Sequence, residues 1–132
     1  MVILYSKFYV TSQNNIKDKT VTQERLKNIL SYIHLNYNKK IRLSDISNFA
    51  NISAGECCRL FRNNKLQSPI EYLITFRLNK SIELLESTTF SISDISEKVG
   101  FGSVSYFIEK FRKQIGCTPL EYKKAYLHKH NY

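Results

Sequence analysis

The chain has 132 residues, a formal net charge of +9, and 42% hydrophobic and 13% aromatic residues. These values exclude a disordered or low-complexity protein and predict one domain, or two small subdomains that share a core. The longest apolar run is far shorter than the roughly 20 residues of a membrane span, so we expect no membrane partner. Three cysteines, of which Cys57 and Cys58 are adjacent, form neither an even disulfide framework nor a zinc spacing and favour a reduced, cytoplasmic setting.

The positive charge lies mainly in the body of the chain, because residues 1–20 carry +2 and residues 21–132 carry +7. A compact basic domain favours a polyanionic partner, most often nucleic acid and sometimes an anionic membrane surface. An excess of lysine also serves solubility, and charge alone does not choose among these explanations.

The beginning of the chain has a different pattern from the rest. Met1–Val10 is rich in β-branched and aromatic residues and predicts a short strand-like arm. A single strand is not stable alone, so it needs a partner, either a second copy of the chain in a homodimer or a sensor domain. The polar segment Thr11–Thr20 predicts a linker.

From Val21 onward the apolar residues have helical spacing. The first helix is expected to end near residues 36–38, and one face of it carries Leu26, Ile29, Leu30, Ile33 and Tyr37. No strand-like alternation of useful length follows, so the body is predicted to be all-α.

An internal repeat is the most informative feature of the sequence. Residues 43–47 (LSDIS) match residues 92–96 (ISDIS) at an offset of 49. Farther on, residues 68–72 (SPIEY) match residues 118–122 (TPLEY) at an offset of 50. The second copy therefore contains one inserted residue between its helices, and a helical unit has been duplicated.

Each copy follows the plan of a short helix, a sharp turn and a longer helix. Ser44 and Ser93 are predicted N-caps of short helices over about residues 44–50 and 93–99. The second helix of each copy is expected to begin at Ser53 or Ser103. The proline that follows each copy starts a further helix in a capping box, and the first of these helices covers about residues 69–86 and is apolar on most sides.

The second helix of the first copy has two faces. Cys57, Leu60 and Phe61 face the core, whereas small residues and two arginines lie on the opposite side. Small side chains let a helix backbone come close to DNA, and arginine bonds bidentately to guanine or to phosphate. In the second copy, Phe107 and Phe111 point inward.

Three stretches together resemble the DNA-binding domain of bacterial AraC/XylS-type transcription regulators: SAGECCRLFR (residues 53–62), VGFGSVSYFIEKFRK (residues 99–113) and GCTPLEY (residues 116–122). The resemblance covers about residues 24–126. It implies seven helices in two homeodomain-like helix-turn-helix subdomains, over about residues 44–65 and 93–115. A long helix over about 69–86 joins them, and a C-terminal helix over about 119–129 completes a domain at 23–132, after an arm and linker at 1–22.

The resemblance also implies function. It implies sequence-specific binding of double-stranded DNA in adjacent major-groove segments and regulation of transcription, usually activation through RNA polymerase, in the cytoplasm at the nucleoid. It implies no cofactor, no metal and no catalytic residue. The groove-facing positions of the family fall on Ser53, Ala54, Gly55, Cys58, Arg59 and Arg62 in the first unit. In the second unit they fall on Ser103, Val104, Ser105, Ile108, Glu109 and Arg112.

Four positions depart from the family pattern. Cys57 replaces a usual leucine, Leu66 stands where the second copy has Gly116, and Lys110 occupies a usually apolar position. Glu109 stands where arginine is common. It either accepts a hydrogen bond from a cytosine amino group or pairs with Arg112 or Lys113 and leaves the second unit a weak reader.

Two other classes of function compete with DNA binding. An enzyme such as a DNA-repair methyltransferase would need a reactive cysteine and metal-binding cysteines in contexts that this sequence lacks. An interaction module that contacts RNA polymerase or another regulator, with little base readout, is the remaining alternative. Regulators of this type often carry an effector-binding domain that residues 1–22 are too short to form, so we expect either part of a longer regulator or a stand-alone one.

Overall fold

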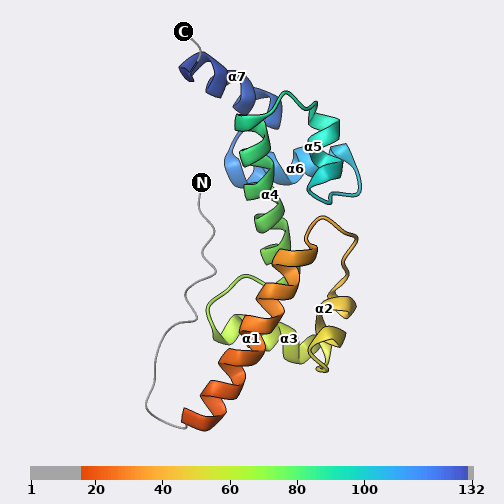
Figure 1. The fold of residues 1–132 in the computed structure, drawn as a ribbon, viewed down its shortest axis with the longest axis vertical. Coiled ribbons are helices and arrows are strands. Elements are labelled where there is room, and N and C mark those ends of the chain that lie inside the picture. The colour runs from red at the N-terminus through yellow and green to blue at the C-terminus, as the bar shows by residue number, and fades with distance from the viewer. Residues whose placement is uncertain (1–15, 131–132) are drawn as a thin grey trace. The chain divides into compact units, whose positions relative to one another are not determined.

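The computed structural model describes residues 16–130, which form seven α-helices and no strand (Figure 1). The all-α class and the number of helices are confirmed within this range. The predicted arm Met1–Val10 lies outside the described residues. In chain order, the helices are α1 (Ile16–Asn36), α2 (Leu43–Phe49), α3 (Ala54–Asn63), α4 (Pro69–Ser87), α5 (Ile92–Lys98), α6 (Val104–Ile115) and α7 (Pro119–His130).

The described residues divide into two compact units. The N-terminal unit comprises residues 16–36 and Ile41–Leu73, and the C-terminal unit comprises Tyr37–Lys40 and residues 74–130. Helix α4 therefore contributes its first residues to one unit and the remainder to the other.

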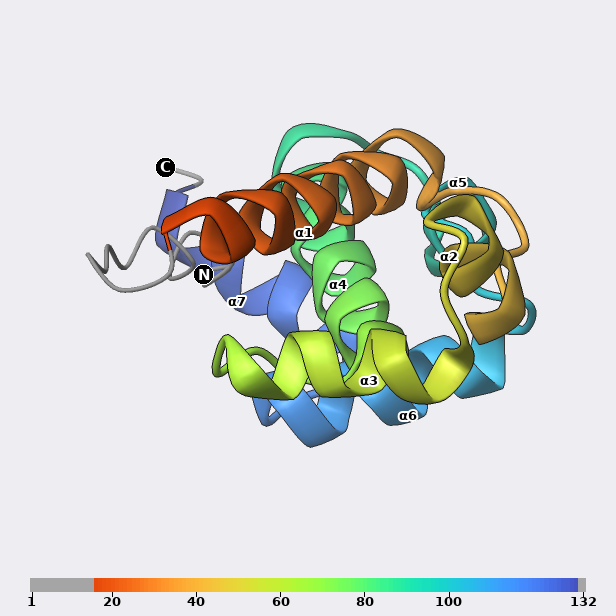
Figure 2. The same cartoon turned by 90° about the horizontal axis from the view of Figure 1, so that it is seen from below.

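Figure 2 shows the backbones of α1, α2 and α3 together with the start of α4. Apolar side chains from these four helices form the core of the N-terminal unit. Phe61 of α3 is fully buried, and its ring meets the buried ring of Tyr72 edge-on at 6.0 Å. The hydroxyl of Tyr72 is hydrogen-bonded to His34 Nε2 at 2.7 Å, so this histidine has a structural partner. The remaining core residues of this unit are Leu26, Ile29, Leu30, Ile33, Ile46, Cys57 and Leu73.

The core of the C-terminal unit combines aliphatic side chains with a row of aromatic rings. Phe107 and Phe111 of α6 are fully buried, with their ring centroids 5.8 Å apart. Phe101, in the turn before α6, lies 5.1 Å from Phe107, and Tyr122 of α7 lies 5.9 Å from Phe111. This row of rings fixes the side of α6 that faces inward, because offset and edge-to-face aromatic pairs prefer these separations.

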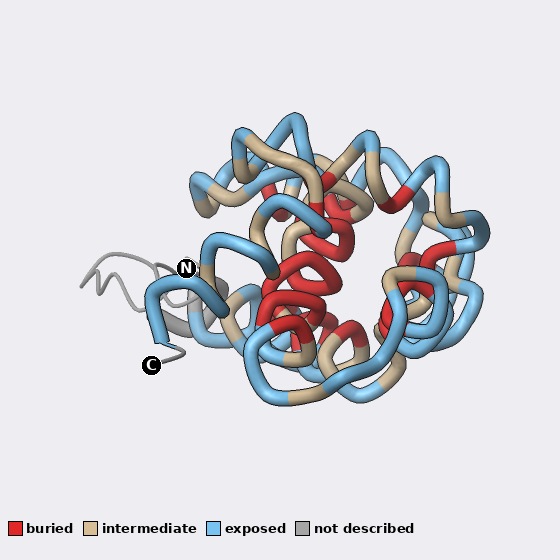
Figure 3. The backbone as a smooth tube through the Cα atoms, turned by 90° about the horizontal axis from the view of Figure 1, so that it is seen from above, coloured by how far each residue is buried: buried red, intermediate tan, exposed pale blue. Residues whose placement is uncertain are grey.

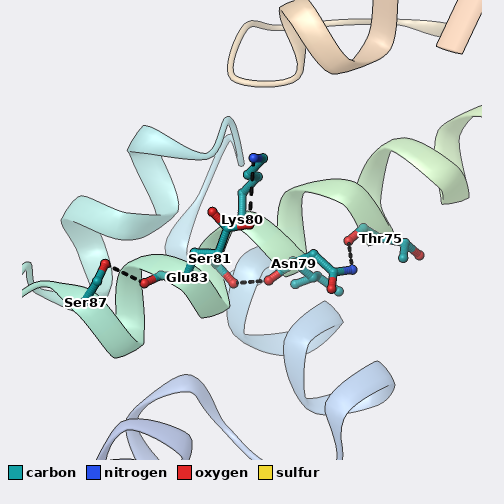
Figure 4. Close-up of polar contacts among 7 residues, drawn as sticks. Thr75, Asn79, Lys80, Ser81, Glu83 and Ser87 are labelled. Atoms are coloured by element: carbon teal, nitrogen blue, oxygen red, sulfur yellow. Dashed lines mark hydrogen bonds and ion pairs between the residues drawn. The ribbon is translucent and has the colours of Figure 1, made fainter. Parts of the chain in front are cut away.

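Helix α4 is buried along most of its length (Figure 3). Two of its buried polar side chains are satisfied by the helix backbone: Asn79 donates to the carbonyl of Thr75 at 2.9 Å and Ser81 to that of Leu78 at 2.6 Å (Figure 4). The ion pair between Lys80 and Glu83, at 3.7 Å, lies on its more exposed side. The sequence predicts a helix that is apolar and buried on most sides, and most side chains of α4 are buried.

The repeat is visible in the backbone. Asn51 and Gly100 have positive φ angles of 57° and 96° at an offset of 49, whereas the N-caps Ser53 and Ser103 are at an offset of 50. The insertion therefore lies just before Ser103. Gly102 is the extra residue, and a Cβ atom built on it would meet nothing within 4 Å.

The predicted caps of the two short helices are wrong by two residues. The N-caps are Arg42 and Ser91, and Ser44 and Ser93 lie inside the first turn. In α5, Ser91 Oγ accepts the backbone N–H of Asp94 at 3.0 Å. Ser91 and Ser93 both carry a hydroxyl group, but it is the hydroxyl of Ser91 that caps the helix. Arg42 has no acceptor, and the Asp45 carboxylate instead accepts the backbone N–H of Arg42 at 2.8 Å.

Helix α1 begins at Ile16, so residues 16–20, predicted as linker, are helical. Apolar periodicity identifies only the part of a helix that packs, and Leu26 is the first buried side chain among those described in α1, from Thr20 onward. Tyr37, predicted as the last position on this helix face, follows α1 and packs edge-on against Phe76 at 5.2 Å.

Candidate DNA interface

The start of α3 is fixed by a reciprocal cap. Ser53 Oγ accepts the backbone N–H of Glu56 at 3.0 Å, and Glu56 Oε1 accepts the backbone N–H of Ser53 at 3.0 Å. The hydrogen bond that the Glu56 carboxylate accepts from the Ser53 backbone N–H is the main reason that the pKa of Glu56 lies below its ordinary value. Since Cys57 and Phe61 are fully buried on the inner side, the rotation of α3 about its axis is also set.

The outward face of α3 is small at its start and basic toward its end. Ser53, Ala54, Gly55, Arg59 and Arg62 are exposed and Cys58 is half-buried, which together are the predicted residues of the first unit. The Arg59 guanidinium lies along the helix over Gly55, with a nitrogen 3.5 Å from where a Cβ atom would stand. In the described part of the chain, neither arginine of this face forms an ion pair within 4.0 Å.

Helix α3 ends differently from α6, as the replacement of glycine by Leu66 predicts. Lys65 takes the left-handed conformation, with φ 59°, and the N–H of Leu66 donates to the carbonyl of Phe61 at 3.0 Å. In α6 the left-handed residue is Gly116, with φ 99°. Both helices therefore end with a residue in the left-handed conformation, but α3 uses Lys65, a residue type for which this conformation is unfavourable.

Helix α6 begins at Ser103, whose Oγ accepts the backbone N–H of Tyr106 at 3.1 Å. With Phe107 and Phe111 inward, the outward face of α6 carries the predicted residues of the second unit. Ser103, Ser105, Glu109 and Arg112 are exposed, and Val104 and Ile108 are half-buried. Each predicted set thus lies at the N-cap and on one helix, α3 or α6, and none of its members is buried.

A shallow hollow lies on the outward face of α6, lined by Ser105, Ile108, Glu109, Arg112 and Lys113. The sequence prediction did not include Lys113 in this face. The signal that identifies it is its spacing, since a residue four positions after Glu109 lies on the same side of a helix. The ammonium group of Lys110, which departs from the family pattern, lies 5.6 Å from the ring centroid of Tyr106.

The cysteines and histidines do not gather into a chemical site. Burial raises the pKa of the Cys57 thiol to about 11, which leaves it an unreactive core residue, while Cys58 is half-buried on the outward face of α3. Among residues 16–130, no group of three or more metal-ligating side chains is placed to hold an ion. No helix in that range is both long and apolar enough to cross a bilayer.

Two helix pairs, each with a buried aromatic inner side and an exposed outer face on its second helix, define a double helix-turn-helix domain. A family model described as "Helix-turn-helix domain" matches residues 46–125. The chain belongs to this family and to its AraC-type branch.

Three comparisons place the chain among regulators. It is 39% identical to the "Uncharacterized HTH-type transcriptional regulator YdeC" of Bacillus subtilis, over 82% of this chain and 37% of that protein. It is 32% identical to the "Virulence regulon transcriptional activator VirF" of Shigella flexneri, over 95% of this chain and 43% of that protein. A crystal structure of a transcriptional regulator with an AraC-type DNA-binding domain, from Chromobacterium violaceum, is 28% identical and superposes with a TM-score of 0.71, covering 80% of this chain and 94% of that one. The chain therefore spans well under half the length of these two sequence relatives.

Proposed function

We propose that this chain binds double-stranded DNA sequence-specifically and regulates transcription, with α3 and α6 each entering a segment of the major groove. The observation that supports this most directly is that α3 and α6 each have a buried inner face and an exposed outer face. An inner side locked by a fully buried phenylalanine, Phe61 or Phe111, holds an exposed outer face with arginine in a fixed orientation. The proposed contact residues are Ser53, Ala54, Gly55, Cys58, Arg59, Arg62, Ser103, Val104, Ser105, Ile108, Glu109 and Arg112.

The chemistry of these faces suits duplex DNA. An arginine can donate two parallel hydrogen bonds to the O6 and N7 atoms of guanine, and it binds phosphate equally well. The small residues Ala54 and Gly55 at the start of α3 let its backbone approach the base edges. The net charge of +9 adds affinity that does not depend on sequence, because lysine and arginine displace counterions from the phosphates.

Activation is the form of regulation that we propose, through contact with RNA polymerase while the protein is bound at the nucleoid in the cytoplasm. A relative that carries the word activator in its name supports this choice. Pairing of Met1–Val10 with a second copy or with a sensor domain is a further prediction, and it concerns residues outside the described range.

The test of DNA binding is selection of duplexes from a random pool by the full chain, followed by affinity measurements on the selected site. We expect the selected duplex to bind at least tenfold more tightly than a scrambled duplex and than either of its single strands. Affinity should fall steeply with salt. Arg62→Ala and Arg112→Ala should weaken binding, whereas Lys27→Ala, which removes an exposed charge from α1, should do so much less.

A failure to enrich any duplex sequence would contradict the proposal. If such a chain still activated transcription with purified RNA polymerase when tethered upstream of a promoter, it would be an interaction module with little base readout.

A further inference from the structure

The two outward faces carry opposite charges at one pair of equivalent positions. At the offset of 50 that relates α3 to α6, Arg59 corresponds to Glu109, and Arg62 corresponds to Arg112. One arginine is therefore common to both faces, whereas the other position carries opposite charges. The two units present the same scaffold with different chemistry at this position.

Glu109 is exposed and so is not part of the core, and it forms no ion pair with any residue in the range 16–130. It lines the hollow on the outward face of α6 with Ser105 and Ile108 on one side and Arg112 and Lys113 on the other. Within residues 16–130, neither of these two cations comes within 4.0 Å of its carboxylate. The carboxylate oxygens are thus available to an external donor, whereas the alternative of an idle ion-pair partner has no support in the described structure.

A carboxylate on a DNA-facing helix has few favourable partners. Phosphates repel it, and it can only accept hydrogen bonds. In the major groove the donors are the N4 amino group of cytosine and the N6 amino group of adenine. Adenine places the acceptor N7 beside its amino group, which repels a second acceptor, whereas cytosine presents the donor without an acceptor of its own.

We infer that Glu109 accepts a hydrogen bond from the N4 amino group of a cytosine and is the specificity-determining residue of the C-terminal unit. This inference rests on the proposed DNA binding. The neighbouring cations, Arg112 and Lys113, lie one turn farther along the same face, where contact with phosphates offsets the repulsion of the carboxylate. The two units consequently read different bases, so the binding site is not a direct repeat.

The test compares base preferences of the full chain and three variants, each selected from the same random duplex pool. Wild type is expected to prefer a C·G pair at one position by about 5- to 150-fold. Glu109→Ala should abolish that preference alone and leave binding to unselected duplexes unchanged or tighter. Glu109→Arg, which places in α6 the residue that α3 has at position 59, should change the preference at that pair from cytosine to guanine on the same strand.

Glu97→Ala is the matched control, because it removes an exposed negative charge from α5 of the same unit. It should leave every base preference unchanged. Identical preferences in wild type and Glu109→Ala would overturn the inference, and so would loss of a preference for adenine instead of cytosine. If wild type itself enriched no duplex, the proposed DNA binding would fail first, so the two failures are distinguishable.

Discussion

The guanidinium of Arg77 is buried and donates from Nε to the backbone carbonyl of Tyr37 at 2.7 Å. A second nitrogen donates to the carbonyl of Lys39 at 2.8 Å, and the group lies 5.7 Å from the ring centroid of Phe101. Burial lowers the pKa of Arg77 from its ordinary value. One side chain of α4 therefore holds the segment Tyr37–Lys40 within the C-terminal unit.

Arg77→Ala should lower the free energy of unfolding by about 2–4 kcal/mol, because two hydrogen bonds from a charged donor are lost and two carbonyls lose their partner. Arg77→Lys should recover only part of this, since an ammonium lacks the planar fork that reaches both carbonyls. Urea denaturation measures the difference, with the exposed Arg62→Ala as control. Equal stability of Arg77→Ala and Arg62→Ala would contradict the assigned role.

Gly100 should tolerate no side chain. Its φ of 96° is one that other residues rarely adopt, and a Cβ atom there would collide with the carbonyl oxygen of Tyr37 and with Cα of Asn38. We expect Gly100→Ala to cost more than about 2 kcal/mol of stability. Gly102→Ala is the matched control, since a Cβ at Gly102 meets nothing, and it should change stability by less than about 1 kcal/mol. Similar losses in both variants would show that the collision at Gly100 is relieved by movement of the segment.

Lys65→Gly should stabilise the N-terminal unit. Lys65 holds a left-handed conformation that costs a side-chain-bearing residue about 1–2 kcal/mol, while glycine loses more entropy on folding. The balance predicts a gain of about 0.5–1 kcal/mol, read from the midpoint of thermal or urea unfolding. Asn51→Gly should gain less, because asparagine tolerates this region better than lysine. A loss of stability in Lys65→Gly would mean that the lysine side chain contributes to packing at the end of α3.

Stability should depend on acid through the cap of α3. The pKa of Glu56 in the folded chain is below its ordinary value of 4.5, because the ionised carboxylate accepts hydrogen bonds from Ser53. Its contribution is therefore present above about pH 4.5 and is lost as pH falls through the lower folded value. Wild type should exceed Glu56→Gln in stability at pH 7, and the gap should be smaller at pH 3 than at pH 7. An equal difference in stability between wild type and Glu56→Gln at both pH values would show that the ionised Glu56 carboxylate does not stabilise the cap.

Much of the architecture could be predicted from the sequence because its signals are local. The Ser/Thr-Pro-x-Glu-Tyr stretches start helices through their own caps, and the Thr118–Glu121 pair bonds reciprocally at 2.9 and 3.1 Å. The 49- and 50-residue offsets placed the insertion between the helices of the second copy without knowledge of the fold, and the backbone then located it just before Ser103. The inward phenylalanines followed from spacing alone.

The features that could not be predicted depend on geometry or on distant partners. Ser91 and Ser93 are both good capping residues, and only the backbone shows which hydroxyl reaches the amide of Asp94. The role of Arg77 depends on carbonyls about 40 positions earlier in the chain, which no local pattern reveals. The availability of Glu109 likewise depends on rotamers of its neighbours, so spacing alone left its pairing open.

The extra residue at Gly102 occupies open space, so the second copy acquired it without disturbing the buried side chains on either side. The inward and outward residues of the duplicated segment are under different constraints. The inward phenylalanines Phe61 and Phe111 are identical in the two copies, whereas outward residues such as Arg59 and Glu109 are not constrained by the core and differ. The two helix-turn-helix units therefore share one folding plan but differ in the charge of their outward faces, most clearly at Arg59 and Glu109.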